Sequence, residues 1–557
     1  MLSFILNKFH DFFEFYTSYY YLDYNNYNEY VYLSKTDNNA NALLTTNNIF
    51  LDLFVNIGRD LSYDELCDYL DKCMKINPYK TIAIIFNCRD RKNGKKEKKI
   101  SNDAMKWLKN NNWEKTYEGN IYTYIEKYGC WKDILTKKYV DINDFDIELI
   151  ANQLIKDKNN LINNKNISLC AKWAPSENKK YDKRNNITEK IGLKIYNILD
   201  KENNLTDDIN NKYIHKWKEL YRKEYITPLR NKINIIENMM CKNKWNEIQY
   251  ENVPAIASKK YKNSFMKHDE SRYLEYLNNV VNGKSKINVT GILPHELVNY
   301  YLSDSNKEID LTIESQWNTI LQNTKSSGIL NNILPIVDVS GSMFGAKNGS
   351  IPAQVSIALG LLISQCSTGN FKNKVISFSE TPELFLVKGN TLKEQIECIK
   401  NINWGYSTNF ESVADIIINN SNTQDDIPDK IVVLSDMQFN EAIKIKDYNN
   451  NHNDNNDELD DDDVDDDDDD ELLHSTFISK FINNNYNPPN IIYWNLNSDN
   501  TKSFPVDFKT NGTAIISGFS EQLLKIFLEY EVLNPEIILD KILEEYIKFV
   551  YVDKNEF

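Results

Sequence analysis

The stretch ILPIVDVSGSMFG, residues 333–345, decides the fold of the second half of the chain. It begins as an apolar run and ends with Asp338, Ser340 and Ser342 at alternate positions. Later apolar runs of similar length alternate with helical stretches: NKVISFS, KIVVLSDM, NIIYWNLN and TAIISGF. Strands that alternate with helices in this way predict right-handed crossovers and a buried parallel sheet. We therefore expect a doubly wound, Rossmann-like α/β domain over residues 330–557.

Polar residues follow two of the predicted strands at the point where each strand ends. Ligands of doubly wound sheets bind outside these carboxyl ends, where the strand order reverses. Two carboxylates and three hydroxyls give a set of oxygen ligands, which suits a hard cation such as Mg²⁺. The residues that we expect to hold this ion are Asp338, Ser340, Ser342, Thr408 and Asp436. The alternative is that Asp338 and Ser342 only cap a turn and a helix.

The first half of the chain has a different pattern. Over residues 44–329 the apolar residues recur mainly at helical spacing, which predicts an α-helical, repeat-like domain, although no repeat of fixed period is found. Residues 1–43 form an aromatic-rich N-terminal segment that charged side chains interrupt too often for a signal peptide or a spanning helix. Together with eight scattered cysteines, this predicts a soluble intracellular protein, located in the cytoplasm, or in the host cytoplasm if the chain is viral.

Charge is distributed unevenly between the two halves. The net charge is −16, with +6 over residues 1–329 and −22 over residues 330–557. Residues 454–471 alone contain 14 acidic side chains. Such a dense block of like charges resists collapse, so we expect a disordered acidic insertion over residues 448–473.

Two lysine-rich stretches in the helical half are candidates for binding RNA. The first is RDRKNGKKEKK, residues 89–99, and the second lies near Tyr261 and Phe265. Cations of this kind neutralise phosphates, and neighbouring aromatic rings stack on unpaired bases. The alternative is a solvated loop in a lysine-rich protein. The candidate side chains are Arg89, Arg91, Lys92, Lys95, Lys96, Lys259, Lys260, Lys262 and Lys267.

The segments DVSGSM, STNF and LSDMQF resemble the metal-ion-dependent adhesion site of von Willebrand factor type A domains. In that family a DxSxS motif, a loop threonine and a later aspartate hold Mg²⁺, and an acidic side chain of a partner often completes the coordination. The resemblance implies these roles for Asp338, Ser340, Ser342, Thr408 and Asp436, and implies an acidic protein partner.

Segments of the helical half resemble a second, largely uncharacterised family: FNCRDRKNGKKEKK, YGCWKDIL, AKWAPSE, YRKEYITPLR and VPAIASKKY. This family, found in plants and large DNA viruses, joins a helical region to a von Willebrand type A domain. The architecture is similar to the TROVE module of the Ro ribonucleoprotein, which implies structured or misfolded RNA as a ligand. Trp131, Trp173 and Trp245 lie in or near these segments, and we expect all three to be buried.

Three classes of function remain. The favoured class is a non-catalytic scaffold that binds RNA through its helical half and Mg²⁺ through its α/β half. The second is a protein–protein adaptor whose metal recruits an acidic side chain of a partner. The third is a metal-dependent phosphoesterase. No positioned general base accompanies the metal ligands in the sequence, so we expect a protein that is not an enzyme and that does not bind membranes.

Overall fold

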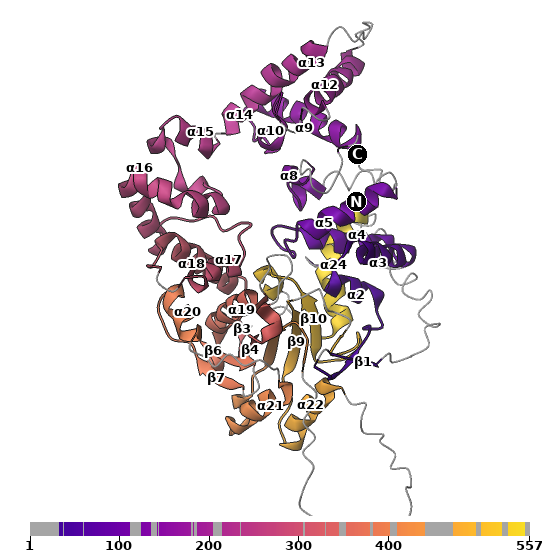
Figure 1. The fold of residues 1–557 in the computed structure, drawn as a ribbon, viewed down its shortest axis with the longest axis vertical. Coiled ribbons are helices and arrows are strands. Elements are labelled where there is room, and N and C mark those ends of the chain that lie inside the picture. The colour runs from indigo at the N-terminus through magenta and orange to yellow at the C-terminus, as the bar shows by residue number, and fades with distance from the viewer. Residues whose placement is uncertain are drawn as a thin grey trace, which may run out of the picture.

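The computed structural model describes residues 33–551, apart from residues 37, 59–60, 112–123, 135–141, 143, 180–181, 183–185, 204–213, 234, 305–306, 329, 345–351, 379–381, 401–408, 440–471, 497–502 and 526–532. The acidic stretch of residues 454–471 and most of the aromatic-rich N-terminal segment therefore fall outside the description. Figure 1 shows helices over the first part of the chain and a sheet with its own helices over the second. The predicted change from helices to alternating strands and helices is confirmed.

The helical part follows a short hairpin of β1 (Leu33–Lys35) and β2 (Asn41–Leu43). Its longer helices are α2 (Ile49–Asn56), α3 (Tyr63–Ile76), α4 (Pro78–Arg89), α5 (Lys99–Asn110), α9 (Asp144–Ile162), α12 (Ile187–Asn203), α16 (Ala255–Val281), α17 (Pro294–Leu302) and α18 (Leu311–Ser326). Between them lie the shorter α8 (Trp131–Ile134), α10 (Cys170–Trp173), α13 (Ile214–Leu220), α14 (Thr227–Ile233) and α15 (Ile236–Cys241).

Local sequence signals explain where these helices begin and which side they bury. Helix α3 begins after Ser62, which forms a reciprocal capping box with Glu65. Its buried residues recur at helical spacing, which turns a single apolar stripe toward the core: Leu66, Leu70, Cys73 and Met74.

No helix among the described residues combines the length and the apolar character that crossing a membrane requires.

The second part is built on a six-stranded sheet in the order β10-β9-β8-β4-β6-β7. The strands are β4 (Ile333–Asp338), β6 (Lys374–Phe378), β7 (Glu383–Leu386), β8 (Lys430–Ser435), β9 (Asn490–Asn495) and β10 (Thr513–Ser517). All neighbours pair in parallel except β6 and β7. Strands β4 and β10 are buried at every residue, as expected for a sheet covered on both faces. The sequence predicted five of these strands and missed β7, a short edge strand that is partly exposed.

Helices connect and cover the sheet. They are α19 (Pro352–Cys366), α20 (Leu392–Lys400), α21 (Phe410–Asn419), α22 (Leu473–Asn483) and α24 (Pro535–Tyr551). Helix α19 packs on β4, β6 and β8. Gly360 permits this close approach, because a Cβ at that position would lie 2.3 Å from Cγ2 of Val337. The packing fixes the backbone of β4 just before its last residue.

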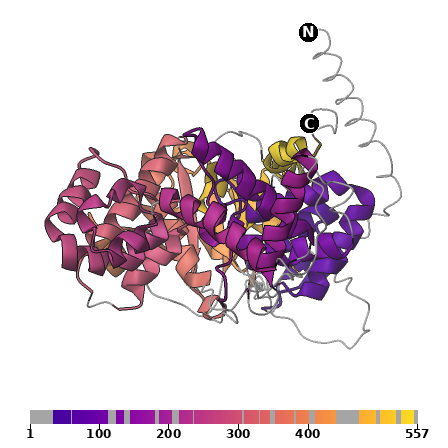
Figure 2. The same cartoon turned by 90° about the horizontal axis from the view of Figure 1, so that it is seen from above.

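The helical part begins and ends on the α/β part, so that it forms an arch (Figures 1 and 2). At its start, α4 packs on α24, where the Tyr546 hydroxyl donates to Asp90 at 2.8 Å. At its end, α17 packs on α19, and Glu314 of α18 accepts the backbone N–H of Leu392 at 2.8 Å. The main hydrophobic core runs through both parts. The two parts therefore form one continuous packed body.

Candidate metal centre and basic surfaces

The strand order reverses between β4 and β8. From β4 the chain adds β6 and β7 on one side, and from β8 it adds β9 and β10 on the other. The carboxyl ends of β4 and β8 lie side by side, because Val337 pairs with Leu434. Open α/β sheets bind their ligands at this switch point, since the two crossovers leave in opposite directions and open a crevice.

Asp338 is the last residue of β4 and is completely buried. One carboxylate oxygen, Oδ1, accepts the backbone N–H of Ser340 at 2.9 Å. The other, Oδ2, accepts the hydroxyl of Ser435 at 2.5 Å. Ser435 ends β8, so this bond ties together the carboxyl ends of the two central strands. Ser435 is not among the residues predicted from the sequence, although it stands directly before Asp436 in the LSDMQF segment.

Asp436 follows β8 and is also buried, with 1% of its surface exposed. Its Oδ1 accepts the backbone N–H of Gln438 at 3.2 Å. Between them, Met437 has a φ of +65°, in the left-handed region that non-glycine residues seldom adopt. Such strain persists only where the surroundings fix the backbone, and it is common at functional sites.

The N-terminal hairpin helps to hold this loop. The side-chain amide of Asn38 donates to the carbonyl of Gln438 at 2.8 Å, and the hydroxyl of Thr36 donates to the carbonyl of Phe439 at 2.6 Å. These contacts join residues that are about four hundred positions apart in the sequence. The backbone after Asp436 is therefore fixed from outside the α/β part.

The hydroxyls of Ser340 and Ser342 lie 3.1 Å apart in the loop after β4. Ser340 is buried, and Ser342 is exposed in a short helical turn, Gly341–Phe344. The buried side chain of Met343 anchors this turn. The structure thus brings four of the five predicted ligands to one edge of the sheet. The fifth, Thr408, is not among the residues that the structure describes.

The electrostatics of this edge favour a cation. Burial, together with the smaller effect of the negative charge of Asp436, raises the pKa of Asp338 to about 7. Two neighbouring carboxylates in a buried site repel each other unless a proton or a cation compensates them. Within the described ranges, no group of three or more His, Cys, Asp or Glu side chains could hold a metal ion. A cation between Asp338 and Asp436 would therefore need hydroxyls or water as further ligands, as Mg²⁺ commonly does.

The first basic stretch is mostly engaged inside the protein. Arg89 is 5% exposed and forms a bidentate ion pair with Asp133, with N–O distances of 2.9 and 3.1 Å. Lys96 is paired with Glu521 at 2.8 Å, and both side chains are buried. These contacts connect the loop after α4 to α8 and to the α/β part. Arg89 and Lys96 are therefore not part of the RNA surface proposed below.

Lys95 is the most deeply buried cation of this stretch, with no exposed surface. Its ammonium group donates to the backbone carbonyl of Phe54 and, at 2.6 Å, to the hydroxyl of Ser517 in β10. It also lies 4.2 Å from the ring centroid of Phe54. Lys95 thus joins α2 to the sheet, and it too is excluded from the proposed RNA surface.

The buried position of Lys95 predicts a specific dependence of stability on pH. Burial lowers the pKa of Lys95 to about 8, whereas in the unfolded chain it keeps its ordinary, higher value. As the pH rises above 8, the folded state loses this proton first, so the contribution of Lys95 to the free energy of unfolding increases. Lys95→Met should destabilise the protein at neutral pH by removing the bonds to Phe54 and Ser517. The difference in the free energy of unfolding between the wild type and this variant should increase by about 1 kcal/mol per pH unit between roughly pH 8 and 10.

Chemical denaturation of the wild type and of Lys95→Met at several pH values measures this difference. Tyrosines and cysteines also titrate at alkaline pH, but they do so in both proteins and cancel in the comparison. A deficit that stays constant with pH would show that Lys95 keeps its proton in the folded state.

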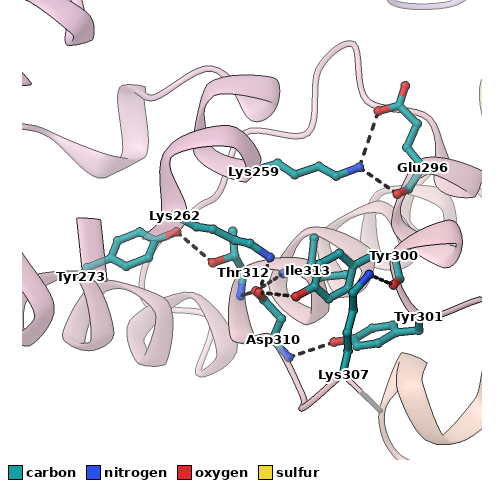
Figure 3. A network of polar contacts seen from close by, with 10 residues as sticks. All are labelled: Lys259, Lys262, Tyr273, Glu296, Tyr300, Tyr301, Lys307, Asp310, Thr312 and Ile313. Atoms are coloured by element: carbon teal, nitrogen blue, oxygen red, sulfur yellow. Dashed lines mark hydrogen bonds and ion pairs between the residues drawn. The ribbon is translucent and has the colours of Figure 1, made fainter. Parts of the chain in front are cut away.

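The second basic stretch is divided between engaged and exposed lysines. Figure 3 shows Lys259 donating to the backbone carbonyl of Glu296, at 2.8 Å, and Lys262 paired with Asp310. These bonds hold α16 against α17 and α18. Lys260 and Lys267 are exposed, and Lys260 lies 4.9 Å from the ring centroid of Tyr261. Of the nine candidate cations, the proposed RNA surface keeps the four that take no part in the ion pairs and hydrogen bonds described above: Arg91, Lys92, Lys260 and Lys267.

The three tryptophans of the helical half differ in exposure. Trp131 is buried, as expected, and Trp245 is half-buried. The expectation of burial was therefore wrong for Trp245 and for Trp173, which exposes 37% of its surface. Ala171 and Ala174 on either side of it are buried, whereas Lys172 is half-buried.

Two family models match the chain. One, described as a domain of unknown function (DUF2828), matches residues 36–146 and 137–330, and another, also described as a domain of unknown function (DUF7788), matches residues 332–548. An uncharacterised protein of Acanthamoeba polyphaga mimivirus is 33% identical, over 92% of this chain and 88% of the relative.

Among solved structures, the Ro (RSR) protein of Deinococcus radiodurans aligns with 86% of this chain and 91% of its own, at 11% identity and a TM-score of 0.32. A likeness this weak carries no argument about fold or ligand.

Proposed function

The chain belongs to the family defined by the DUF2828 domain, and we propose that it is a non-catalytic binding scaffold with an adhesion-type Mg²⁺ site. In this proposal the C-terminal part is a von Willebrand factor type A-like domain. The ligands of the ion are Asp338, Ser340, Ser342, Thr408 and Asp436. The helical arch is the RNA-binding part of the scaffold.

A single observation carries the proposal of a metal site. Asp338 and Asp436 are both buried at the switch point of the sheet, one at the end of each central strand. Burying two carboxylates side by side costs stability unless a positive charge compensates them. A bound divalent cation would supply that positive charge at the edge where the two carboxylates lie. Such an ion would supply an electrophilic centre with an open position for an anionic oxygen.

The proposal of RNA binding is supported by the cations that remain at the surface of the helical part. Lys92, Lys260 and Lys267 are exposed, and Lys260 stands over the ring of Tyr261. The helical half carries a net charge of +6 and the α/β half −22, so phosphates are attracted to the arch and repelled from the sheet.

The adaptor remains the alternative. If the ion at Asp338 and Asp436 takes its last ligand from an acidic side chain of a protein, the scaffold recruits that protein and not RNA. A metal-dependent phosphoesterase is the third class. It would need a general base within hydrogen-bonding reach of the attacking water, and the described contacts of Asp338, Ser340 and Asp436 supply only ligand positions.

A salt titration separates these classes. Exchange of Arg91, Lys92, Lys260 and Lys267 for Gln should weaken RNA binding across many sequences. It should also reduce the slope of log affinity against log salt by about 0.7 for each lost contact to a single strand. A matched control removes the same charge from exposed lysines of the acidic half: Lys372, Lys388, Lys541 and Lys548.

The same assay includes Asp338→Asn. Loss of RNA binding only in the variant of the helical half supports the scaffold. Loss only in Asp338→Asn indicates that the metal bridges the RNA. Absence of RNA binding by the wild type contradicts the RNA part of the proposal and leaves the adaptor.

A further inference from the structure

An exposed indole is unusual in a turn whose neighbouring apolar residues are buried and whose backbone is held by hydrogen bonds. The turn of residues 170–176, CAKWAPS, contains α10 and places Trp173 at the surface with 37% exposure. Cys170 and Ala171 on one side of the indole and Ala174 on the other are buried. The turn is well anchored, so the exposure of Trp173 does not result from a loosely held loop.

The anchor is Arg230 of α14. Its Nε donates to the carbonyl of Ala171 at 2.8 Å, and its Nη2 donates to the carbonyl of Ala174 at 2.6 Å. Nη1 donates to the hydroxyl of Ser176 at 2.9 Å. One guanidinium thus fixes the backbone on both sides of Trp173. The buried hydroxyl of Tyr221 adds a bond to the carbonyl of Pro175 at 2.6 Å.

Two lysines flank the indole. The ammonium group of Lys132, in α8, lies 5.0 Å from the ring centroid of Trp173, and that of Lys172 lies 5.5 Å from it. A cation over an exposed ring stabilises the fold only slightly, by about 0.5 to 1 kcal/mol. The contacts therefore do not explain why the indole is held in water, where burying it would stabilise the protein more.

An aromatic face beside two positive charges matches the chemistry of one unpaired nucleotide. The base stacks on the ring, and its phosphates meet the ammonium groups. Because Arg230 and Tyr221 already hold the turn, a ligand would bind without ordering it first, which lowers the entropic cost of binding.

We propose that Trp173, with Lys132 and Lys172, is a stacking platform for an unpaired base of single-stranded RNA. The inference rests on the proposed RNA binding of the helical part and names a site within it. Figure 1 shows α8, α10 and α14 on the arch, away from the sheet that carries Asp338. The platform should therefore act independently of the metal site.

The test measures binding of a fluorescein-labelled single-stranded oligouridine RNA by fluorescence anisotropy. Trp173→Ala should weaken binding about tenfold, and Trp173→Phe should retain most of the affinity, because any aromatic ring offers a face. Binding of a duplex RNA of the same length should not change. Lys172→Gln should reduce the salt slope by about 0.7, whereas Trp173→Ala should leave the slope unchanged.

Two controls keep the outcomes distinct. Thermal melting verifies that each variant is folded, and Trp173→Leu, which has no aromatic face, replaces Trp173→Ala if the latter is not. If the wild type binds the RNA and all Trp173 variants bind it equally well, the proposal that Trp173 stacks on a base is wrong. The proposed RNA binding of the helical part then still stands. If the wild type binds no RNA, both fail. An equal loss of single-stranded and duplex binding in Trp173→Ala would also overturn stacking, since a duplex offers no unpaired base.

Discussion

Asp338→Asn should abolish the stabilisation of this protein by Mg²⁺. A ligand that binds only the folded state raises the free energy of unfolding by about 2.7 kcal/mol at a concentration one hundred times its dissociation constant. Replacing one of the two anionic ligands with a neutral amide should remove that gain. The measurement is the melting temperature in EDTA and in increasing MgCl₂, for the wild type and the variant.

The same substitution should leave the metal-free protein at least as stable as the wild type. An Asn side chain can still accept the N–H of Ser340 and donate to the hydroxyl of Ser435, so the local bonds survive. It also removes the repulsion between two buried carboxylates. Opposite effects with and without Mg²⁺ distinguish a metal site from a structural aspartate, whose loss would destabilise the protein under both conditions.

The matched control is Asp415→Asn. Asp415 belongs to the same half of the chain but forms a surface ion pair with Lys480, at 2.8 Å. Its substitution should change stability by less than about 1 kcal/mol and should preserve the Mg²⁺ response. An Mg²⁺ response that survives in Asp338→Asn would contradict the proposed site.

Arg89→Met should destabilise the protein by about 3 to 5 kcal/mol, because it leaves the charge of Asp133 buried without its main partner. The double variant Arg89→Met/Asp133→Asn should recover a large part of this loss, since it removes the stranded charge. Urea denaturation of the two single variants and the double variant measures the coupling. Lys72→Met, which breaks an exposed pair with Asp68, should have little effect and serves as the control.

This result would separate a structural arginine from a nucleic-acid contact. If Arg89→Met is as stable as Lys72→Met but binds RNA more weakly, the side chain is available to phosphates in solution. The buried ion pair with Asp133 would then not describe the state that binds RNA.

The sequence predicted the sheet well because its signals are local. Each central strand is a short apolar run bounded by turns, and Asp338 and Asp436 interrupt two of these runs at their carboxyl ends. The rule that ligands meet at these ends then placed both carboxylates at one edge. Strand β7 was missed because four residues at an exposed edge carry little periodicity.

The contacts of the basic stretches could not be predicted from local patterns. A run such as RDRKNGKKEKK is usually solvated, yet Lys95 reaches Ser517, which is 422 positions away in the sequence. Burial of such a cation depends on a partner that only the tertiary fold supplies. The same holds for Trp173, since its exposure follows from how Arg230 fixes the turn and not from its own neighbours in the sequence.

The central claim is that a divalent cation binds between Asp338 and Asp436. The most direct measurement is an anomalous difference map from crystals grown with Mn²⁺, which is a close substitute for Mg²⁺ at oxygen sites. One strong peak is expected within coordination distance of the Asp338 carboxylate and the Ser340 and Ser342 hydroxyls. Electron density at this edge with no anomalous peak, at Mn²⁺ concentrations that raise the melting temperature, would contradict it.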